Sequence, residues 1–516
     1  MTRNILILDT TLRDGEQSPG FSMASSEKLS ITRELLRLKV DIIEAGFPAS
    51  SPGDFASVQK IVEYVGSKAV VCALARALPG DIEAAGTALA QAERARIHTG
   101  LGVSPCHLKD KLQMSPEDAL NSAIKAVKLA RTYTDDVQFY AEDAGRAERS
   151  YLARVLTEVL KAGATTVNVP DTTGYLLPQQ YAELISWLMA HVEGIDKATV
   201  AVHCHNDLGM ATASSIAGVA AGASQVECTI NGIGERAGNA ALEEVVMALD
   251  LHHKELGVST NIRKDELTRA SRLIAAITGM SVPANKAVVG SNAFAHSSGI
   301  HQDGVLKCRS TYEIIDPVSV GARASQIVLT VRSGRAALKH RLGELGYTPD
   351  PASFNQIYDR FLDIADKKNQ IYDEDLEVLM AEHGRALEAL WKLKILQVSC
   401  GSPLKATATI VLEGPNGEEC DTCASGTGPI DATFKAIDAL VAVPQAELLR
   451  FAIQAVTRGS DALGEVSVQL SNEQGQIFSG RGADGDIIVS SAKAYLNALN
   501  RLLGSTDSSL DTRSNK

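Results

Sequence analysis

The sequence predicts an α/β fold whose first part, residues 1–275, is a closed (β/α)8 barrel of the TIM type. Short apolar segments alternate with amphipathic helical segments from residue 3 to about 250, and eight such units can be counted. A TIM barrel needs eight units in about 250 residues. Polar residues also gather where the expected strands end. An open, doubly wound sheet would show the same alternation and is the alternative.

The eight expected strands are short apolar runs, as suits parallel strands that are buried on both faces. In chain order they read NILILDT, DIIEAGFP, VVCALAR, RIHTGLGV, DVQFYAED, TTVNVPDT, ATVAVHCHND and QVECTING. Helical spacing of apolar residues marks the segments between them, such as SSEKLSITRELLRLKV and SPEDALNSAIKAVKLA. In both, a Ser followed by an acid predicts the helix N-cap.

The pattern changes after the barrel. Residues 276–390 are expected to form linker subdomains that contribute to the active site, and 331–390 read as mainly helical. Residues 391–505 predict a separate α+β domain with strands at KILQVSC, KATATIVLEG and GEVSVQLSN and helices at DATFKAIDALVA and VSSAKAYLNALNRLL. The polar tail, 506–516, is expected to be disordered.

Composition excludes several classes of protein. With 45% hydrophobic and 22% charged residues, the 516-residue chain can bury a large core. A net charge of −12 and the lack of a basic run disfavour nucleic-acid binding. No apolar segment is long enough to span a membrane and no signal-peptide pattern opens the chain, so we expect a cytoplasmic protein.

The cysteines suggest reduced thiols. Eight are scattered along the chain, and Cys420 and Cys423 form one C-x-x-C without a second pair. We therefore expect ordinary strand or loop residues there in preference to a zinc or redox site.

A metal site is expected at the barrel mouth, because TIM-barrel active sites lie at the carboxyl ends of the strands. His203 and His205 are two positions apart on strand seven, so both imidazoles face the same side. Asp14 after strand one and Asn239 after strand eight would complete a mixed nitrogen and oxygen site for Mg, Mn or Zn. Two hydrogen-bonded histidines are the alternative for the H-x-H pair alone.

Seven motifs in this order closely resemble the 2-isopropylmalate synthases and their alkylmalate-synthase relatives. They are DTTLRDGEQSPG, EAGFPASSPGDF, EDAGR, PDTTGY, HCHNDLG, NGIGERAGN and HSSGIHQDGVLK. The likeness covers nearly the whole chain, including a C-terminal segment that resembles that family's leucine-sensing regulatory domain.

The resemblance implies a metal-dependent condensation of acetyl-CoA with a 2-oxo acid, followed by thioester hydrolysis that releases CoA. It implies metal ligands at Asp14, His203, His205 and Asn239 and an oxyanion-stabilising role for Arg13. It also implies that Glu142, His301 and Tyr312 handle the proton of the acetyl methyl group. His301 and Tyr312 lie beyond the barrel, so a partner subunit is expected to deliver them in a homodimer. A monovalent cation activator is a further possibility that the family suggests.

The 2-oxo acid is expected to contact six residues at the strand ends: His98, Gly100, Tyr140, Asn168, Pro170 and Thr172. Relatives that make 2-isopropylmalate carry a bulky residue at position 100 and Ser at position 140. Tyr140 resembles citramalate synthases, which use pyruvate, whereas Gly100 and Gly102 suggest room for a larger acid such as phenylpyruvate, giving benzylmalate. The main expectation is 2-oxoisovalerate, which gives 2-isopropylmalate in the first committed step of leucine biosynthesis, and neutral drift is the alternative explanation of these differences.

Rival functions are weaker. A C–C lyase of the same superfamily would carry a catalytic cysteine in the loop after strand eight, and NGIGERAGN has none. Metal-dependent hydrolase barrels usually place H-x-H on strand one, and a sensor with an inactive barrel would not need the complete ligand set. The effector of the C-terminal domain is expected to be leucine or another pathway product.

Overall fold

The computed structural model describes the chain in segments: residues 2–322, 326–366, 368, 371–384, 390–401, 403–441, 446–455, 464–472 and 477–508. Two compact units are formed, one by Met1–His296 with Ser310–Gln326 and one by Ser297–Arg309 with Ile327–Lys516. The predicted domain limits at residues 275, 390 and 505 stay predictions.

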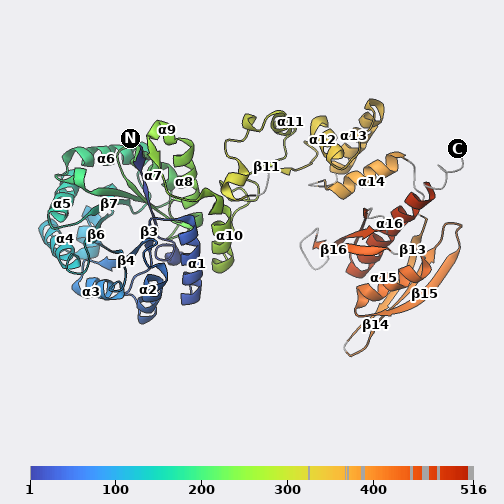
Figure 1. Ribbon diagram of the computed structural model, residues 1–516, viewed down its shortest axis with the longest axis horizontal. Coiled ribbons are helices and arrows are strands. Elements are labelled where there is room, and N and C mark those ends of the chain that lie inside the picture. The colour runs from blue at the N-terminus through green and yellow to red at the C-terminus, as the bar shows by residue number, and fades with distance from the viewer. Residues whose placement is uncertain are drawn as a thin grey trace. The chain divides into compact units, whose positions relative to one another are not determined.

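The first unit contains the predicted closed barrel, which is confirmed (Figure 1). Eight parallel strands pair in chain order and close between the last and the first. Their bounds are β2 Leu6–Asp9, β3 Ile42–Glu44, β4 Val70–Arg76, β5 Ala95–Gly102, β6 Asp136–Glu142, β7 Thr166–Asp171, β8 Thr199–Cys204 and β9 Gln225–Cys228. Seven of them fall within the segments that the sequence predicts, and β5 begins one residue earlier than predicted, at Ala95; the open-sheet alternative is excluded.

Helices surround the strands and bury their apolar stripes against them (Figure 1). They are α1 Ser25–Leu38, α2 Pro52–Val65, α3 Pro79–Ala88, α4 Pro116–Ala130, α5 Arg149–Lys161, α6 Pro178–His191, α7 Ala211–Ala220 and α8 Leu242–Leu251. Next along the chain come α9 His253–Leu256, the short strand β10 Val258–Ser259 and α10 Leu267–Thr278. Strand β10 pairs with β1 Arg3–Asn4. This arrangement fixes the strand ends and therefore the loops that carry the site.

The two predicted N-caps differ in outcome. The Oγ of Ser115 accepts the backbone N–H of Asp118 at 3.1 Å, so SPED caps α4 as expected. In SSEK the prediction is wrong, because the N-cap is Ala24 and Ser25 already lies in α1. The carboxylate of Glu27 accepts the Ala24 N–H at 2.7 Å, so this acid reaches back to the helix start without a serine cap.

The second unit begins with helices. The prediction of a mainly helical region is confirmed. Its helices are α11 Gly299–Lys307, α12 Arg335–Glu344, α13 Pro351–Ala365 and α14 Asp373–Gly384. A small core forms among the last three, with Leu338, Phe361 and Leu376 fully or almost fully buried. Where the chain passes from one unit to the other there are two short strands, β11 Ala295–His296 and β12 Gln326–Ile327.

The C-terminal part is built from two βββα repeats. Strands β13 Lys392–Ser399, β14 Ala406–Glu413 and β15 Glu419–Gly426 precede α15 Pro429–Leu440, and β16 Glu447–Ala455, β17 Gly464–Ser471 and β18 Ile477–Asp484 precede α16 Ile487–Ser508. Each set of strands is an antiparallel sheet. The sequence reading missed β15, β16 and β18, which carry weak apolar alternation.

The C-x-x-C pair and the polar tail, both predicted from the sequence, belong to the C-terminal part. Cys420 and Cys423 lie on β15, where residues three apart point to opposite faces, so the pair cannot chelate one ion. The prediction of a disordered tail from residue 506 is wrong for residues 506–508, because α16 continues to Ser508. Residues 509–516 lie outside the described residues. Among the described helices, none is both long and apolar enough to cross a bilayer.

Replacing Ser115 with Ala should lower the free energy of unfolding by about 1 kcal/mol, because one N-terminal N–H of α4 loses its acceptor. The change can be measured by calorimetry as a shift of the barrel transition. Ser25→Ala is the matched control and should leave that transition within error, since Ser25 caps nothing. Equal effects of the two substitutions would contradict the assignment of the caps.

Candidate active site

A pocket of about 540 Å³ opens at the carboxyl ends of the barrel strands. Eleven of the fourteen predicted site residues line it: Arg13, Asp14, His98, Gly100, Tyr140, Glu142, Asn168, Pro170, Thr172, His203 and His205. Asn239 adjoins this group through a hydrogen bond to Asp14. Residues far apart in the sequence are thus brought together because each of them lies on a barrel strand or in the loop that follows one.

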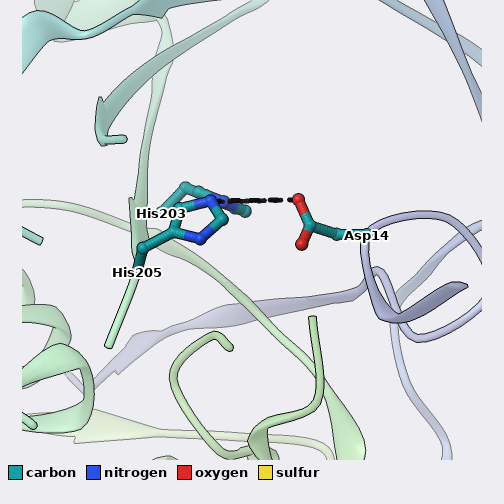
Figure 2. A group of neighbouring side chains, drawn as sticks. All are labelled: Asp14, His203 and His205. Atoms are coloured by element: carbon teal, nitrogen blue, oxygen red, sulfur yellow. Dashed lines mark hydrogen bonds and ion pairs between the residues drawn. The ribbon is translucent and has the colours of Figure 1, made fainter. Parts of the chain in front are cut away.

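Asp14, His203 and His205 converge on one point, as Figure 2 shows. Each histidine Nε2 lies 3.9 Å from Oδ2 of Asp14, and the two Nε2 atoms are 3.1 Å apart. All three side chains are buried. Two imidazole nitrogens and a carboxylate facing one another at these distances match the donor set of a divalent metal site.

Asn239 fits the same site. An isolated bridge pairs it with His205, so the loop after β9 is fixed beside the end of β8. Its Nδ2 donates to Oδ1 of Asp14 at 2.8 Å, while its Oδ1 is buried and has no hydrogen-bond partner among the described residues. A buried amide oxygen without a partner is costly, and a bound cation would satisfy it.

The charges of Asp14 and His205 suit metal binding. For His203, burial lowers the pKa, but Glu227 and Asp14 outweigh burial and raise this pKa. Burial raises the pKa of Asp14, but Arg13 and the two histidines outweigh it and bring this pKa to about 2. Burial, reinforced by His203, lowers the pKa of His205 to about 4. Asp14 is therefore ionised and His205 neutral at physiological pH, which are the states that metal ligands require.

Arg13 lies at the edge of this group and is held on two sides. Its Nη1 donates to Asp14 at 2.8 Å and its Nε to Oε2 of Glu44 at 2.7 Å. Glu44 is fully buried on β3 and also accepts from Thr10 and His98. Burial raises the pKa of Glu44, yet Arg13 and His98 outweigh burial, so this pKa lies well below its usual range.

Glu44 was not identified as a site residue from the sequence, although it stands in the EAGFP motif. Glu227 on β9 and Gln138 on β6 were missed too. The available signal was a charged or amide residue inside an otherwise apolar barrel strand, as in DIIEAG, DVQFY and QVEC. Such residues are almost never fully buried unless they have partners.

Gly100 and Tyr140 fit each other across neighbouring strands. A Cβ added at Gly100 would collide with the carbonyl oxygen of Tyr140 and lie 2.7 Å from Cγ of its ring. That ring packs edge-on against His98, with centroids 5.0 Å apart. Tyr140 therefore occupies the space beside Gly100, and the glycine alone leaves no room for a larger 2-oxo acid.

Gly102 and Glu142 meet a π-helical turn, His107–Leu112. A Cβ at Gly102 would lie 2.6 Å from Cβ of His107, so the glycine lets this turn approach the strand. From the same turn, Nζ of Lys111 contacts both carboxylate oxygens of Glu142, at 2.6 and 2.7 Å. The carboxylate is thus held at the pocket rim by a half-exposed lysine.

Asn168 on β7 and Thr172 directly after it present polar atoms to the pocket. Oδ1 of Asn168 is buried and has no hydrogen-bond partner among the described residues. The Oγ1 of Thr172 accepts the backbone N–H of Asp143 at 2.9 Å. Both side chains can therefore meet a polar ligand, and Pro170 between them pairs with His203 on β8.

The structure places His301 on α11 of the second unit and Tyr312 in the 310–326 segment of the first. Both side chains are exposed. Their delivery to the barrel mouth by a partner subunit stays a prediction.

Comparison with known proteins identifies three matching family models. Residues 4–274 match the HMGL-like model, 288–369 the homocitrate synthase post-HMGL domain-like model and 370–503 the LeuA allosteric (dimerisation) domain model.

Among curated proteins, 2-isopropylmalate synthase of Olsenella uli is 57% identical over 508 residues, covering 98% of this chain and 99% of the relative. The enzyme of that name from Nitrosococcus oceani is 52% identical over 505 residues, covering 98% of each. Among solved structures, hydroxymethylglutaryl-CoA lyase from Pseudomonas aeruginosa is 22% identical with a TM-score of 0.47, covering 55% of this chain and 95% of that one. Identity at this level over nearly the full length establishes that the chain belongs to the 2-isopropylmalate synthase family.

Proposed function

We propose that this protein condenses acetyl-CoA with 2-oxoisovalerate to give 2-isopropylmalate, with hydrolysis of the thioester and release of CoA. The reaction is the first committed step of leucine biosynthesis. The observation that carries the proposal is the convergence of Asp14, His203 and His205, with the unpartnered Oδ1 of Asn239, beside the guanidinium of Arg13. Relatives of the same length that are named for this activity support it.

A divalent ion held by Asp14, His203, His205 and Asn239 would polarise the keto group of the 2-oxo acid. Two imidazoles beside two oxygen donors suit Mn or Zn better than Mg, which prefers oxygen ligands. Metal dependence agrees with the HMGL-like family and with the cluster seen here. The choice of Mn or Zn is part of the proposal.

The chain's own residues would then bind and orient the reactants. Arg13, fixed by Glu44 and Asp14, would donate hydrogen bonds to the oxyanion that develops at the keto oxygen. Asn168 and Thr172 would hold the 2-oxo acid. Loss of a proton from the acetyl methyl group needs a base, and we assign this step to Glu142 together with His301 and Tyr312.

The fit of Tyr140 beside Gly100 supports a 2-oxo acid with a compact branched side chain. The ring takes the volume that a bulky residue at position 100 takes in relatives, so the two differences offset each other. An aromatic acid such as phenylpyruvate would compete with the Tyr140 ring for this space. Pyruvate remains the alternative substrate.

We further propose a homodimer with leucine as the effector of the C-terminal part. The match of residues 370–503 to an allosteric dimerisation domain supports this, as do the two sheets and two helices found there. Activation by a monovalent cation is included as an expectation from the family.

Metal removal tests the proposed reaction. Chelator-treated protein should release no CoA thiol from acetyl-CoA and 2-oxoisovalerate, and added Mn²⁺ should restore release. His205→Ala should lower the rate on the order of 100-fold, because one metal ligand is lost. The matched control is His191→Ala on the outer helix α6, which should keep the full rate. No thiol release with 2-oxoisovalerate, phenylpyruvate or pyruvate would contradict the proposal.

Tyr140→Ser should shift the substrate preference, because truncation opens the space beside Gly100. We expect kcat/KM for phenylpyruvate relative to 2-oxoisovalerate to rise about 10- to 200-fold, the range for changes of pocket size. Tyr140→Phe keeps the ring and should leave the ratio within about 3-fold of the unsubstituted protein. An unchanged ratio in Tyr140→Ser would show that this ring does not set the pocket size.

A further inference from the structure

A line of buried polar side chains crosses the barrel interior beneath the pocket. Between Arg13 at one end and His203 at the other lie Glu44, His98, Gln138 and Glu227. None of these four is more than 2% exposed. The interior of a TIM barrel is normally filled with apolar side chains, and buried polar groups are tolerated only when they are hydrogen-bonded.

The amide of Gln138, in the middle of this line, has one possible orientation. Its Oε1 accepts from Nη1 of Arg96 at 2.9 Å and from Nε2 of Gln225 at 2.9 Å. The other end, Nε2, must then face Nε2 of His98 at 2.9 Å and Oε1 of Glu227. Both amide N–H groups are therefore donated, one to the imidazole and one to the carboxylate.

The donation to His98 determines the direction of the hydrogen bonds toward Arg13. Because Nε2 of His98 accepts, its ring proton is on Nδ1 and is donated to Oε1 of Glu44 at 2.7 Å. The other oxygen of Glu44 then receives Nε of Arg13 at 2.7 Å. Both nitrogens of His98 are thus occupied, so this residue borders the pocket with ring carbons and not with a hydrogen bond to the 2-oxo acid.

The donation to Glu227 acts toward the metal site. The second oxygen of Glu227 lies 3.2 Å from Nδ1 of His203. The two atoms are close enough for an ion pair but do not meet the geometry of a hydrogen bond. Nε2 of the same ring faces Asp14 and His205. A carboxylate on the far nitrogen of a metal-binding histidine fixes its ring orientation and raises its basicity.

We propose that Gln138 is a positioning residue that holds Arg13 and His203 in their working orientations at the same time. Its amide acts on the guanidinium of Arg13 through His98 and Glu44. The same amide acts on the imidazole of His203 through Glu227. The catalytic role of Arg13 and the metal-binding role of His203 come from the proposed function, so this proposal rests on it. Gln138 would influence both metal binding and turnover while touching neither the ligands nor the reactants.

The test measures Mn²⁺ affinity by electron paramagnetic resonance together with kcat, KM and thermal stability of the full-length protein. Gln138→Met keeps the length and removes both donors. It should weaken Mn²⁺ binding about 10- to 100-fold and lower kcat by a similar factor, with KM for acetyl-CoA within about 3-fold. Thr166 is buried and pairs with Gln138 on the next strand, so Thr166→Val is the matched control. It should change neither the Mn²⁺ affinity nor kcat.

Wild-type Mn²⁺ affinity in folded Gln138→Met, or an equal loss in Thr166→Val, would overturn the proposal. If Gln138→Met does not fold, the substitutions Glu227→Gln and Glu44→Gln test the two branches of the proposal separately. Glu227→Gln should weaken Mn²⁺ binding, whereas Glu44→Gln should lower kcat and leave Mn²⁺ affinity within about 3-fold. Equal effects of this pair on Mn²⁺ affinity would also overturn it. Since metal affinity is read without turnover, a protein that binds Mn²⁺ but releases no CoA would contradict the proposed function alone.

Discussion

The charge of the buried Asp14 carboxylate determines how the barrel mouth is built. A carboxylate removed from water costs several kcal/mol unless opposite charges or hydrogen bonds compensate it. Arg13, two imidazoles and the amide of Asn239 surround it and supply that compensation. The two imidazole nitrogens, 3.1 Å apart, can share one hydrogen bond without an ion, and a cation would satisfy both of them together with the carboxylate.

Each compensating group requires its own partner, so the network extends inward. Arg13 is paired with Glu44, which is paired with His98, and Gln138 connects His98 to Glu227 below His203. The barrel makes this possible because strands that are not neighbours in the sheet point side chains into one shared interior, as with Gln138 on β6 and Gln225 on β9. Orientation of the site is therefore set by the layer beneath it as much as by the residues that line it.

Much of this architecture could be predicted from the sequence, and the limits have physical causes. The eight strands are visible because parallel strands buried on both faces are continuous apolar runs, and H-x-H at a strand end is a local pattern. Glu44, Gln138 and Glu227 act through partners on other strands, which no local pattern reveals. The space at Gly100 could not be settled from the sequence for the same reason, since it depends on the Tyr140 ring from the neighbouring strand. In the C-terminal part, β15, β16 and β18 alternate too weakly to stand out, whereas α15 and α16 carry clear helical spacing.

Anomalous diffraction from crystals grown with Mn²⁺ tests the central claim most directly. We expect one strong peak about 2.0–2.3 Å from a carboxylate oxygen of Asp14, Nε2 of His203, Nε2 of His205 and Oδ1 of Asn239. A peak elsewhere, or none between these side chains at saturating Mn²⁺, would contradict it.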